Sequence, residues 1–243
     1  MGKMNLSATV RQVGQLAQAH GMKAYLVGGP VRDLLLRRPN VDLDLVVEGS
    51  GIRLAEAFAA QHRGARLVRY PAFKTATVHL PGRRLVDFAT ARKETYVRPG
   101  AFPKVVPSDI RNDLFRRDFT VNAMAVAVNP ETWGKLVDPF DGLADLRSKK
   151  IRVLHKKSFI DDPTRILRAA RFKTRLGFTI EHKTLKLLKA AVQAKALDTI
   201  KPQRYSKEFN KILKEEKPQL AIKCLKSWHA WKGVVHGTRR KSQ

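Results

Sequence analysis

The chain has 243 residues, of which 43% are hydrophobic, so it can bury the core of one or two domains, and this composition excludes an intrinsically disordered protein. It has no run of about 18 apolar residues, and its single cysteine excludes an internal disulfide or a cysteine-based zinc site. We therefore expect a protein of the reducing cytoplasm without a secretory leader. The net charge of +27, from 48 Lys and Arg against 21 Asp and Glu, exceeds what solubility requires and indicates a polyanionic partner.

The first 150 residues are predicted to form a mixed α/β region. Apolar residues at helical spacing predict helices at 6–20, 31–38, 52–61 and 109–116. Alternating apolar and polar residues, bounded by turn signals, predict strands at 24–27, 41–47, 66–70, 75–80, 84–89, 125–128 and 135–137. In the second helix we expect Val31, Leu34 and Leu35 to be buried.

Residues 92–108 interrupt this pattern. They contain Pro99, Gly100, Pro103 and Pro107, and we expect them to form a long loop without regular structure. Loops of that length are usually functional or mobile.

From about residue 151 onward the pattern predicts only helices, at 163–175, 182–194, 202–215 and 218–231. The charge changes at the same place, because residues 1–146 hold 21 bases and 14 acids whereas residues 147–243 hold 27 bases and 7 acids. This asymmetry indicates a catalytic part that needs carboxylates, residues 1–150, followed by a part that binds nucleic acid, residues 151–243. The alternative is a basic, well-solvated surface.

Two aspartates stand on one predicted strand. Asp42 and Asp44 are two residues apart, so their side chains project from the same face while Leu43 faces the core. Adjacent carboxylates repel each other unless a cation lies between them, and Asp87 on another strand supplies a third oxygen ligand if the two strands are neighbours. Oxygen ligands without His or Cys favour Mg²⁺. The alternative is a pair of aspartates on a solvated strand face.

A glycine pair precedes these aspartates at a strand-to-helix junction. Gly28 and Gly29 allow backbone N–H groups to approach a phosphate, and the N-terminus of the following helix favours an anion. Arg32, one turn into that helix, can add a charge-assisted hydrogen bond. Taken alone, such a pair is more often a plain turn.

Four motifs follow one another in the chain: Gly28-Gly-Pro-Val-Arg-Asp33, Asp42-Leu-Asp44, Arg116-Arg-Asp-Phe-Thr-Val-Asn-Ala-Met-Ala125 and Asp161-Asp-Pro-Thr-Arg-Ile-Leu-Arg-Ala-Ala-Arg-Phe172. In this order and spacing the chain resembles the class II CCA-adding enzymes and their bacterial poly(A) polymerase relatives. The resemblance implies an α+β fold, in which a nucleotidyltransferase head with a mixed sheet and helices is followed by an all-helical basic neck and the start of a body. This family usually continues into further helical regions, so we expect a short form.

The resemblance also implies roles for single residues. Asp42 and Asp44 would bind the metal, with Asp87 as the nearby third acid. The incoming nucleotide would be contacted by Gly29, Arg32 and Arg117, in a pocket supported by Asp118 and Asn122.

The last motif has a physical logic of its own. Asp162, Arg165, Arg168 and Arg171 are each three residues apart, so on a helix they form one ridge. Asp162 accepts and Arg165 donates hydrogen bonds, which matches the amino group and ring nitrogen of cytosine or adenine but not the carbonyl groups of guanine or uracil. Arg168 and Arg171 would lie nearer the triphosphate. Helix N-capping by Asp161 or Asp162 is the competing explanation.

The implied function is addition of C and A to the 3′ end of tRNA from CTP and ATP, with no membrane and no obligate protein partner. Two Mg²⁺ ions at Asp42 and Asp44 would lower the pKa of the RNA 3′-hydroxyl, which attacks the α-phosphate and releases pyrophosphate. In this family a flexible loop before the Arg-Arg-Asp motif is associated with A addition, and residues 92–108 provide one. The alternatives are an enzyme that adds only A, a poly(A) polymerase, and a non-catalytic RNA-binding protein on the same fold.

Overall fold

The computed structural model describes residues 2–39, 43–82 and 84–231, with side chains from residue 8 onward. The chain divides into two compact units. The first unit comprises Met1–Glu94 and Val105–Leu146, and the second comprises Thr95–Lys104 and Arg147–Gln243. Within the described residues, no helix combines the length and the apolar composition that crossing a bilayer requires.

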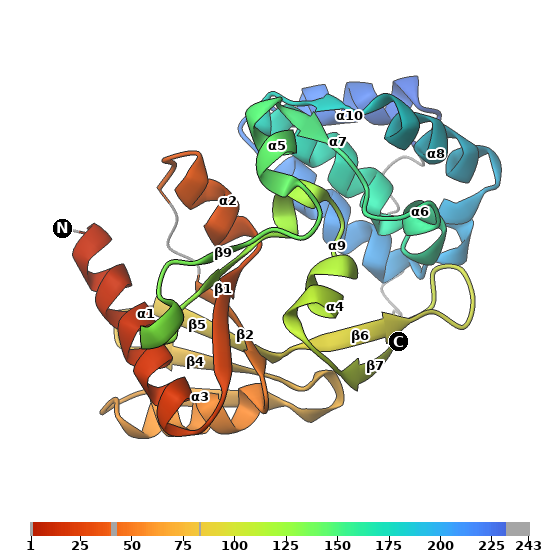
Figure 1. The fold of residues 1–243 in the computed structure, drawn as a ribbon. Helices are drawn as coiled ribbons and strands as arrows, with labels where there is room; N and C mark the ends of the chain where they lie inside the picture. Colours follow the sequence, from red (N-terminus) through yellow and green to blue (C-terminus); the bar gives the residue numbers. More distant parts are fainter. Residues whose placement is uncertain (1, 40–42, 83, 232–243) are drawn as a thin grey trace, which may run out of the picture. The chain divides into compact units, whose positions relative to one another are not determined.

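A mixed sheet forms the centre of the first unit (Figure 1). Its seven strands in the described part of the chain have the order β3-β4-β5-β2-β1-β8-β9. Strands β2 and β5 run parallel, and the other neighbours run antiparallel. The strands are β1 (Lys23–Val27), β2 (Leu43–Glu48), β3 (Arg66–Tyr70), β4 (Thr75–Leu80), β5 (Arg84–Thr90), β8 (Ala125–Ala127) and β9 (Leu136–Val137).

Helices α1 (Gly2–Ala19) and α3 (Gly51–Ala60) pack on one face of this sheet and against each other (Figure 1). Strand alternation supplies the apolar surface beneath them: Val86 and Phe88 of β5 are fully buried, and Phe58 of α3 packs on Phe88. The residues that alternate with them on β5, Leu85 and Asp87, are exposed and belong to the opposite face. Burial of one face therefore determines that Asp87 projects from the other.

The remaining helices of the first unit are short. They are α2 (Gly29–Leu35), α4 (Ile110–Phe115) and α5 (Gly142–Arg147), which runs one residue past the unit boundary. Asp109 begins α4 by accepting a hydrogen bond from the backbone N–H of Asn112, so this helix starts where its capping residue lies.

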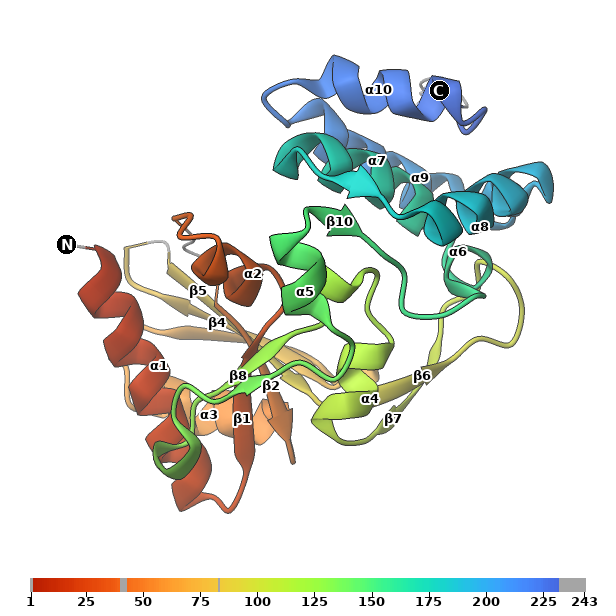
Figure 2. The ribbon, with the colours of Figure 1, turned by 45° about the horizontal axis from the view of Figure 1, so that its top comes forward.

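The second unit is mainly helical, with α7, α9 and α10 side by side (Figure 2). Its helices are α6 (Ser158–Asp161), α7 (Thr164–Leu176), α8 (His182–Gln193), α9 (Pro202–Leu213) and α10 (Pro218–Ser227). The four long helices were predicted from residue spacing, with ends displaced by four residues or fewer. The apolar residues Ile166, Leu167 and Ala170 of α7 are fully buried in its core.

Three expectations about the fold are wrong. Leu34 and Leu35 are 60% and 37% exposed, because only the first turn of α2 is covered by the rest of the unit.

Residues 92–108 are not irregular throughout, since β6 (Arg92–Thr95) and β7 (Lys104–Pro107) form a two-stranded sheet. Proline is compatible with such a ribbon where it ends a strand.

The third error concerns the region after residue 150. It contains the two-residue strands β10 (Lys150–Ile151) and β11 (Thr179–Ile180), which pair in parallel. Strands this short carry no periodicity that a sequence pattern can detect.

Candidate active site

Two aspartates of the first unit lie side by side on neighbouring parallel strands. Asp44 on β2 is the register partner of Asp87 on β5, and Asp87 is in turn the register partner of Thr77 on β4. The Thr77 hydroxyl donates a hydrogen bond to the Asp87 carboxylate. Asp87 was expected to join the other acids only if its strand was a neighbour of theirs. Since β5 pairs directly with β2, this condition is met. Asp42 lies outside the described residues.

These carboxylates line a cavity of about 250 Å³ in the first unit. Its other lining residues include Tyr70, Arg116 and Arg117, and none of the described residues that line it is His or Cys. Among the described residues no group of three His, Cys, Asp or Glu side chains is placed to hold a metal ion. Two oxygen donors without nitrogen or sulfur ligands nevertheless suit a hard divalent cation such as Mg²⁺.

The two arginines of the cavity are held by one buried carboxylate. Asp113 has no exposed surface, and it accepts hydrogen bonds from Nη2 of Arg116 at 2.7 Å and from Nη2 of Arg117 at 2.9 Å. Burial alone would raise the pKa of Asp113, but the charges of Arg117 and Arg116 outweigh it and hold that pKa below its usual value. Asp113 therefore stays ionised and fixes two positive groups at the cavity.

A second acid, Glu94, also binds Arg116. Its Oε1 accepts hydrogen bonds from Arg116 Nη1 and from Arg92 Nη2, both at 3.1 Å. Arg92 also donates to the backbone carbonyl of Phe73 at 2.6 Å. The Arg116 guanidinium is thus bound by two acids, which restricts its orientation.

Gly28 lies against the second arginine. Its φ of +72° is a conformation that other residues rarely adopt, and a Cβ atom there would come within 2.7 Å of Arg117 Nη1. Only glycine allows the arginine this close approach. The neighbouring Gly29 has no such restriction, since a Cβ atom there would come no closer than 3.8 Å to its nearest neighbour, Arg32 Nη2.

Arg32 is almost fully buried, with 3% of its surface exposed. Its guanidinium donates to both carboxylate oxygens of Asp33 at 2.9 Å and to Asn122 Oδ1 at 2.6 Å. The Asn122 amide donates in turn to Asp118 Oδ1 at 3.0 Å. The structure therefore brings the predicted Arg32, Asn122 and Asp118 together in one network, while direct contact of Arg32 with a nucleotide stays a prediction.

In the second unit, Asp162 is not part of the predicted helical ridge. It lies between α6 and α7 in an extended conformation. Of the four residues of the predicted ridge, only Arg165, Arg168 and Arg171 therefore lie on α7. The error arises because Pro163 separates Asp162 from the helix that begins at Thr164. Asp162 Oδ1 accepts a hydrogen bond from the Thr164 backbone N–H at 3.2 Å, but Pro163 is the N-cap residue, so neither Asp161 nor Asp162 caps the helix as expected.

The arginines of α7 have partners within the second unit. Arg165 is buried, and its Nη1 donates to Ser158 Oγ at 2.6 Å. Arg168 and Arg171 form ion pairs with Glu208 at 3.5 Å and Glu215 at 3.3 Å. Burial and the nearby Arg168 lower the pKa of Arg171, although both acids oppose this. Their predicted place near a triphosphate is not tested by these contacts.

Asp113 and Glu94 were not predicted as site residues from the sequence. Asp113 precedes Arg116 and Arg117 by three and four residues, the spacing at which helical side chains meet, so this signal was available. Glu94 lies 22 residues from Arg116, and no local pattern marks that contact.

Comparison with known proteins places this site in a family. Residues 24–152 match the family model described as the poly A polymerase head domain, and residues 177–238 match one described as a probable RNA and SrmB-binding site of polymerase A. The A-adding tRNA nucleotidyltransferase of Aquifex aeolicus is 46% identical over 89% of this chain and 26% of its own length. The CC-adding tRNA nucleotidyltransferase of Deinococcus radiodurans is 38% identical over 84% of this chain and 54% of its own.

A solved structure of a CCA-adding enzyme superposes with a TM-score of 0.88 at 44% identity, over 93% of this chain and 53% of that one. The chain thus spans between a quarter and about half of the length of these relatives. The expected α+β architecture, a mixed sheet with helices followed by a helical region, is confirmed by this match and by the family model.

Proposed function

The chain belongs to the poly(A) polymerase head-domain family that includes the class II CCA-adding enzymes, and we propose that it is a template-independent nucleotidyltransferase that adds C and A to the 3′ end of tRNA. The observation that carries the proposal is the register of Asp44 with Asp87 in a cavity that Arg116 and Arg117 also line. It combines ligands for a divalent cation with cationic groups for a triphosphate.

In the proposed reaction the 3′-hydroxyl oxygen of the RNA forms a bond to the α-phosphorus of CTP or ATP. The bond from that phosphorus to the bridging oxygen breaks, and pyrophosphate leaves with the electron pair. Asp44 and Asp87, with Asp42 as the third candidate, would hold Mg²⁺, which when bound lowers the pKa of the hydroxyl and neutralises phosphate charge. Arg116 and Arg117 would bind the phosphate oxygens by charge-assisted hydrogen bonds.

The base would be chosen by side chains of the second unit. We assign to Asp162 the hydrogen bond from the amino group of cytosine or adenine, and to Arg165 the hydrogen bond to the adjacent ring nitrogen. Guanine and uracil place a carbonyl where this amino group stands, so the carboxylate would repel them. Contacts of Gly28, Gly29, Arg32, Arg168 and Arg171 with the nucleotide belong to the same proposal.

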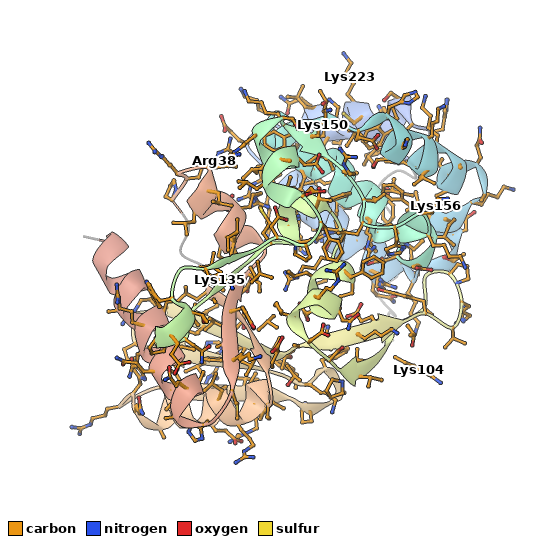
Figure 3. The ribbon with its side chains drawn as sticks, viewed as in Figure 1. Arg38, Lys104, Lys135, Lys150, Lys156 and Lys223 are labelled. Carbon is orange, nitrogen blue, oxygen red and sulfur yellow. The ribbon has the colours of Figure 1, made fainter. Side chains whose placement is uncertain are left out.

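The RNA would be bound mainly by the charge of the second unit. Residues 147–243 carry 27 bases and 7 acids, and exposed lysines such as Lys150, Lys156 and Lys223 project from this unit (Figure 3). Their positive charges favour contact with phosphates without reading sequence. The match of residues 177–238 to a family named for probable RNA binding supports this assignment.

Incubation with Mg²⁺, each labelled nucleotide and tRNAs ending before, within and after CC tests the function. A CCA-adding enzyme extends the shorter ends with C, extends CC with a single A and leaves CCA unchanged. Extension of CC with A alone would favour the A-adding alternative, which the name of the Aquifex aeolicus relative supports. Repeated A addition would identify a poly(A) polymerase, and no incorporation on any substrate would overturn the enzymatic proposal.

A further inference from the structure

One arginine of the second unit joins three segments that are distant in sequence. Arg204, in the first turn of α9, donates from Nη1 to the backbone carbonyl of Gly100 at 2.7 Å and from Nη2 to Asp162 Oδ1 at 2.9 Å. Its guanidinium also lies over the ring of Phe102, 5.2 Å from the centroid. The two terminal nitrogens of one rigid, planar group thus bind two separate acceptors.

The hydrogen bonds of Asp162 divide unequally between its two oxygens. Oδ1 accepts from Arg204, from the Thr164 hydroxyl at 2.6 Å and from the Thr164 backbone N–H at 3.2 Å. Within the described residues no donor reaches Oδ2. The carboxylate is therefore oriented through one oxygen, while the other keeps its capacity to accept a hydrogen bond from a ligand.

Gly100 is closely packed against residues next to Asp162 and against Thr199. Gly100 donates its N–H to the carbonyl of Asp161 at 3.3 Å. Its φ is +66°, and a Cβ atom there would lie 2.4 Å from the Thr199 hydroxyl oxygen and 2.9 Å from the Thr199 backbone. Within the second unit, residues 95–104 are thus held next to Asp161 and Asp162, and Arg204 donates one hydrogen bond to Gly100 and one to Asp162.

We propose that Arg204 is a positioning residue for base selection: it orients the Asp162 carboxylate so that Oδ2 faces the incoming base, and it couples that orientation to residues 95–104. This inference rests on the proposed role of Asp162. Arg204 itself touches neither nucleotide nor RNA in this account and acts through the carboxylate. Replacing Arg204 with alanine leaves the Asp162 carboxylate and its Thr164 contacts in place, but it removes both the positive charge and the third donor that restrains this carboxylate.

The variants Arg204→Lys and Arg204→Ala separate charge from geometry. Lysine keeps the positive charge, but its single ammonium group cannot reproduce the planar fork that reaches both Gly100 and Asp162. Alanine removes both the charge and the fork. We expect Arg204→Ala to lower the preference for CTP and ATP over UTP and GTP, measured as the ratio of kcat/KM values, by roughly tenfold or more. Arg204→Lys should recover only part of that ratio.

Gln203→Ala is the matched control, because Gln203 is the exposed neighbour of Arg204 on the same helix turn. It should keep the wild-type preference. Melting temperatures of all variants, measured alongside, separate unfolding from altered selection. A fall in the nucleotide preference supports the inference only in a variant that is still folded at the assay temperature.

A double-mutant cycle with Asp162→Asn tests whether Arg204 acts through Asp162. If it does, adding Arg204→Ala to Asp162→Asn leaves the already reduced preference unchanged, whereas a separate structural role makes the two losses multiply. Equal preference in wild type and Arg204→Ala, or multiplying losses in the cycle, would overturn the inference. Absence of incorporation by the wild type would instead refute the proposed function, so the two failures are distinguishable.

Discussion

Asp44 and Asp87 are register partners in the parallel pair of β2 and β5. Neighbouring strands lie about 4.8 Å apart, so two carboxylates that share a face and a register position repel each other at close range. This arrangement is unfavourable unless a cation neutralises it, and Arg116 and Arg117 line the same cavity. The first unit therefore concentrates opposite charges where the proposed reaction needs them.

Asp44→Asn and Asp87→Asn should each lower nucleotide incorporation by about a thousandfold or more, because an amide cannot replace an anionic metal ligand. The affinity for tRNA should stay within about twofold, since the charge that binds RNA lies mainly in residues 147–243. Labelled-nucleotide incorporation and filter binding on the same preparations measure both. Joint loss of incorporation and tRNA binding would contradict the assigned role.

Gly28→Ala should impair nucleotide use rather than stability alone. The backbone strain at φ +72° costs on the order of 1–3 kcal/mol, and the added methyl group displaces Arg117 from the position it holds. We expect KM for ATP to rise. Gly177→Ala is the control, because Gly177 also has a positive φ but faces open space. It should lower the melting temperature without changing KM, and equal KM effects in both variants would point to strain alone.

Asp113→Asn should destabilise the fold by about 3 kcal/mol, because it leaves Arg116 and Arg117 without their shared buried anion. The pKa of Asp113 lies below its usual value of 3.8, so its ion pairs stabilise the folded state above that pH and are lost as the pH falls through the folded-state pKa. The unfolding free energy of Asp113→Asn should therefore decline less steeply than that of the wild type below about pH 4. Denaturant titrations at several pH values measure this, and parallel pH profiles would refute it.

Arg165→Ala should relax base choice, because it removes the proposed donor to the base. Ser158→Ala should do so more weakly, since it removes only the hydroxyl that accepts from Arg165 Nη1 at 2.6 Å. Steady-state kinetics with the four nucleotides compare the variants. Unchanged discrimination in Arg165→Ala would remove this account of selection.

The helices and strands that local residue patterns specify were predicted from the sequence. Strands β3 and β4 have the predicted bounds, because alternation and flanking turn residues specify them. The exposure of Leu34 was not predictable, since helical spacing shows which face is apolar but not whether another element covers it.

The same limit applies to the site. The pairing of Asp44 with Asp87 was expected only on the condition that the strands are neighbours, because register depends on the whole sheet. The contact of Arg204 with Asp162 and Gly100 joins residues that are 42 and 104 positions apart. Only the folded chain brings them together.

The central claim is that the carboxylates of Asp44 and Asp87 hold a divalent cation beside a bound nucleotide. Anomalous diffraction from crystals soaked with Mn²⁺ and a non-reacting ATP analogue tests it most directly. We predict an anomalous peak about 2.1 Å from a carboxylate oxygen of at least one of the two aspartates, with the triphosphate next to it. A bound analogue with its manganese away from both carboxylates would contradict the claim.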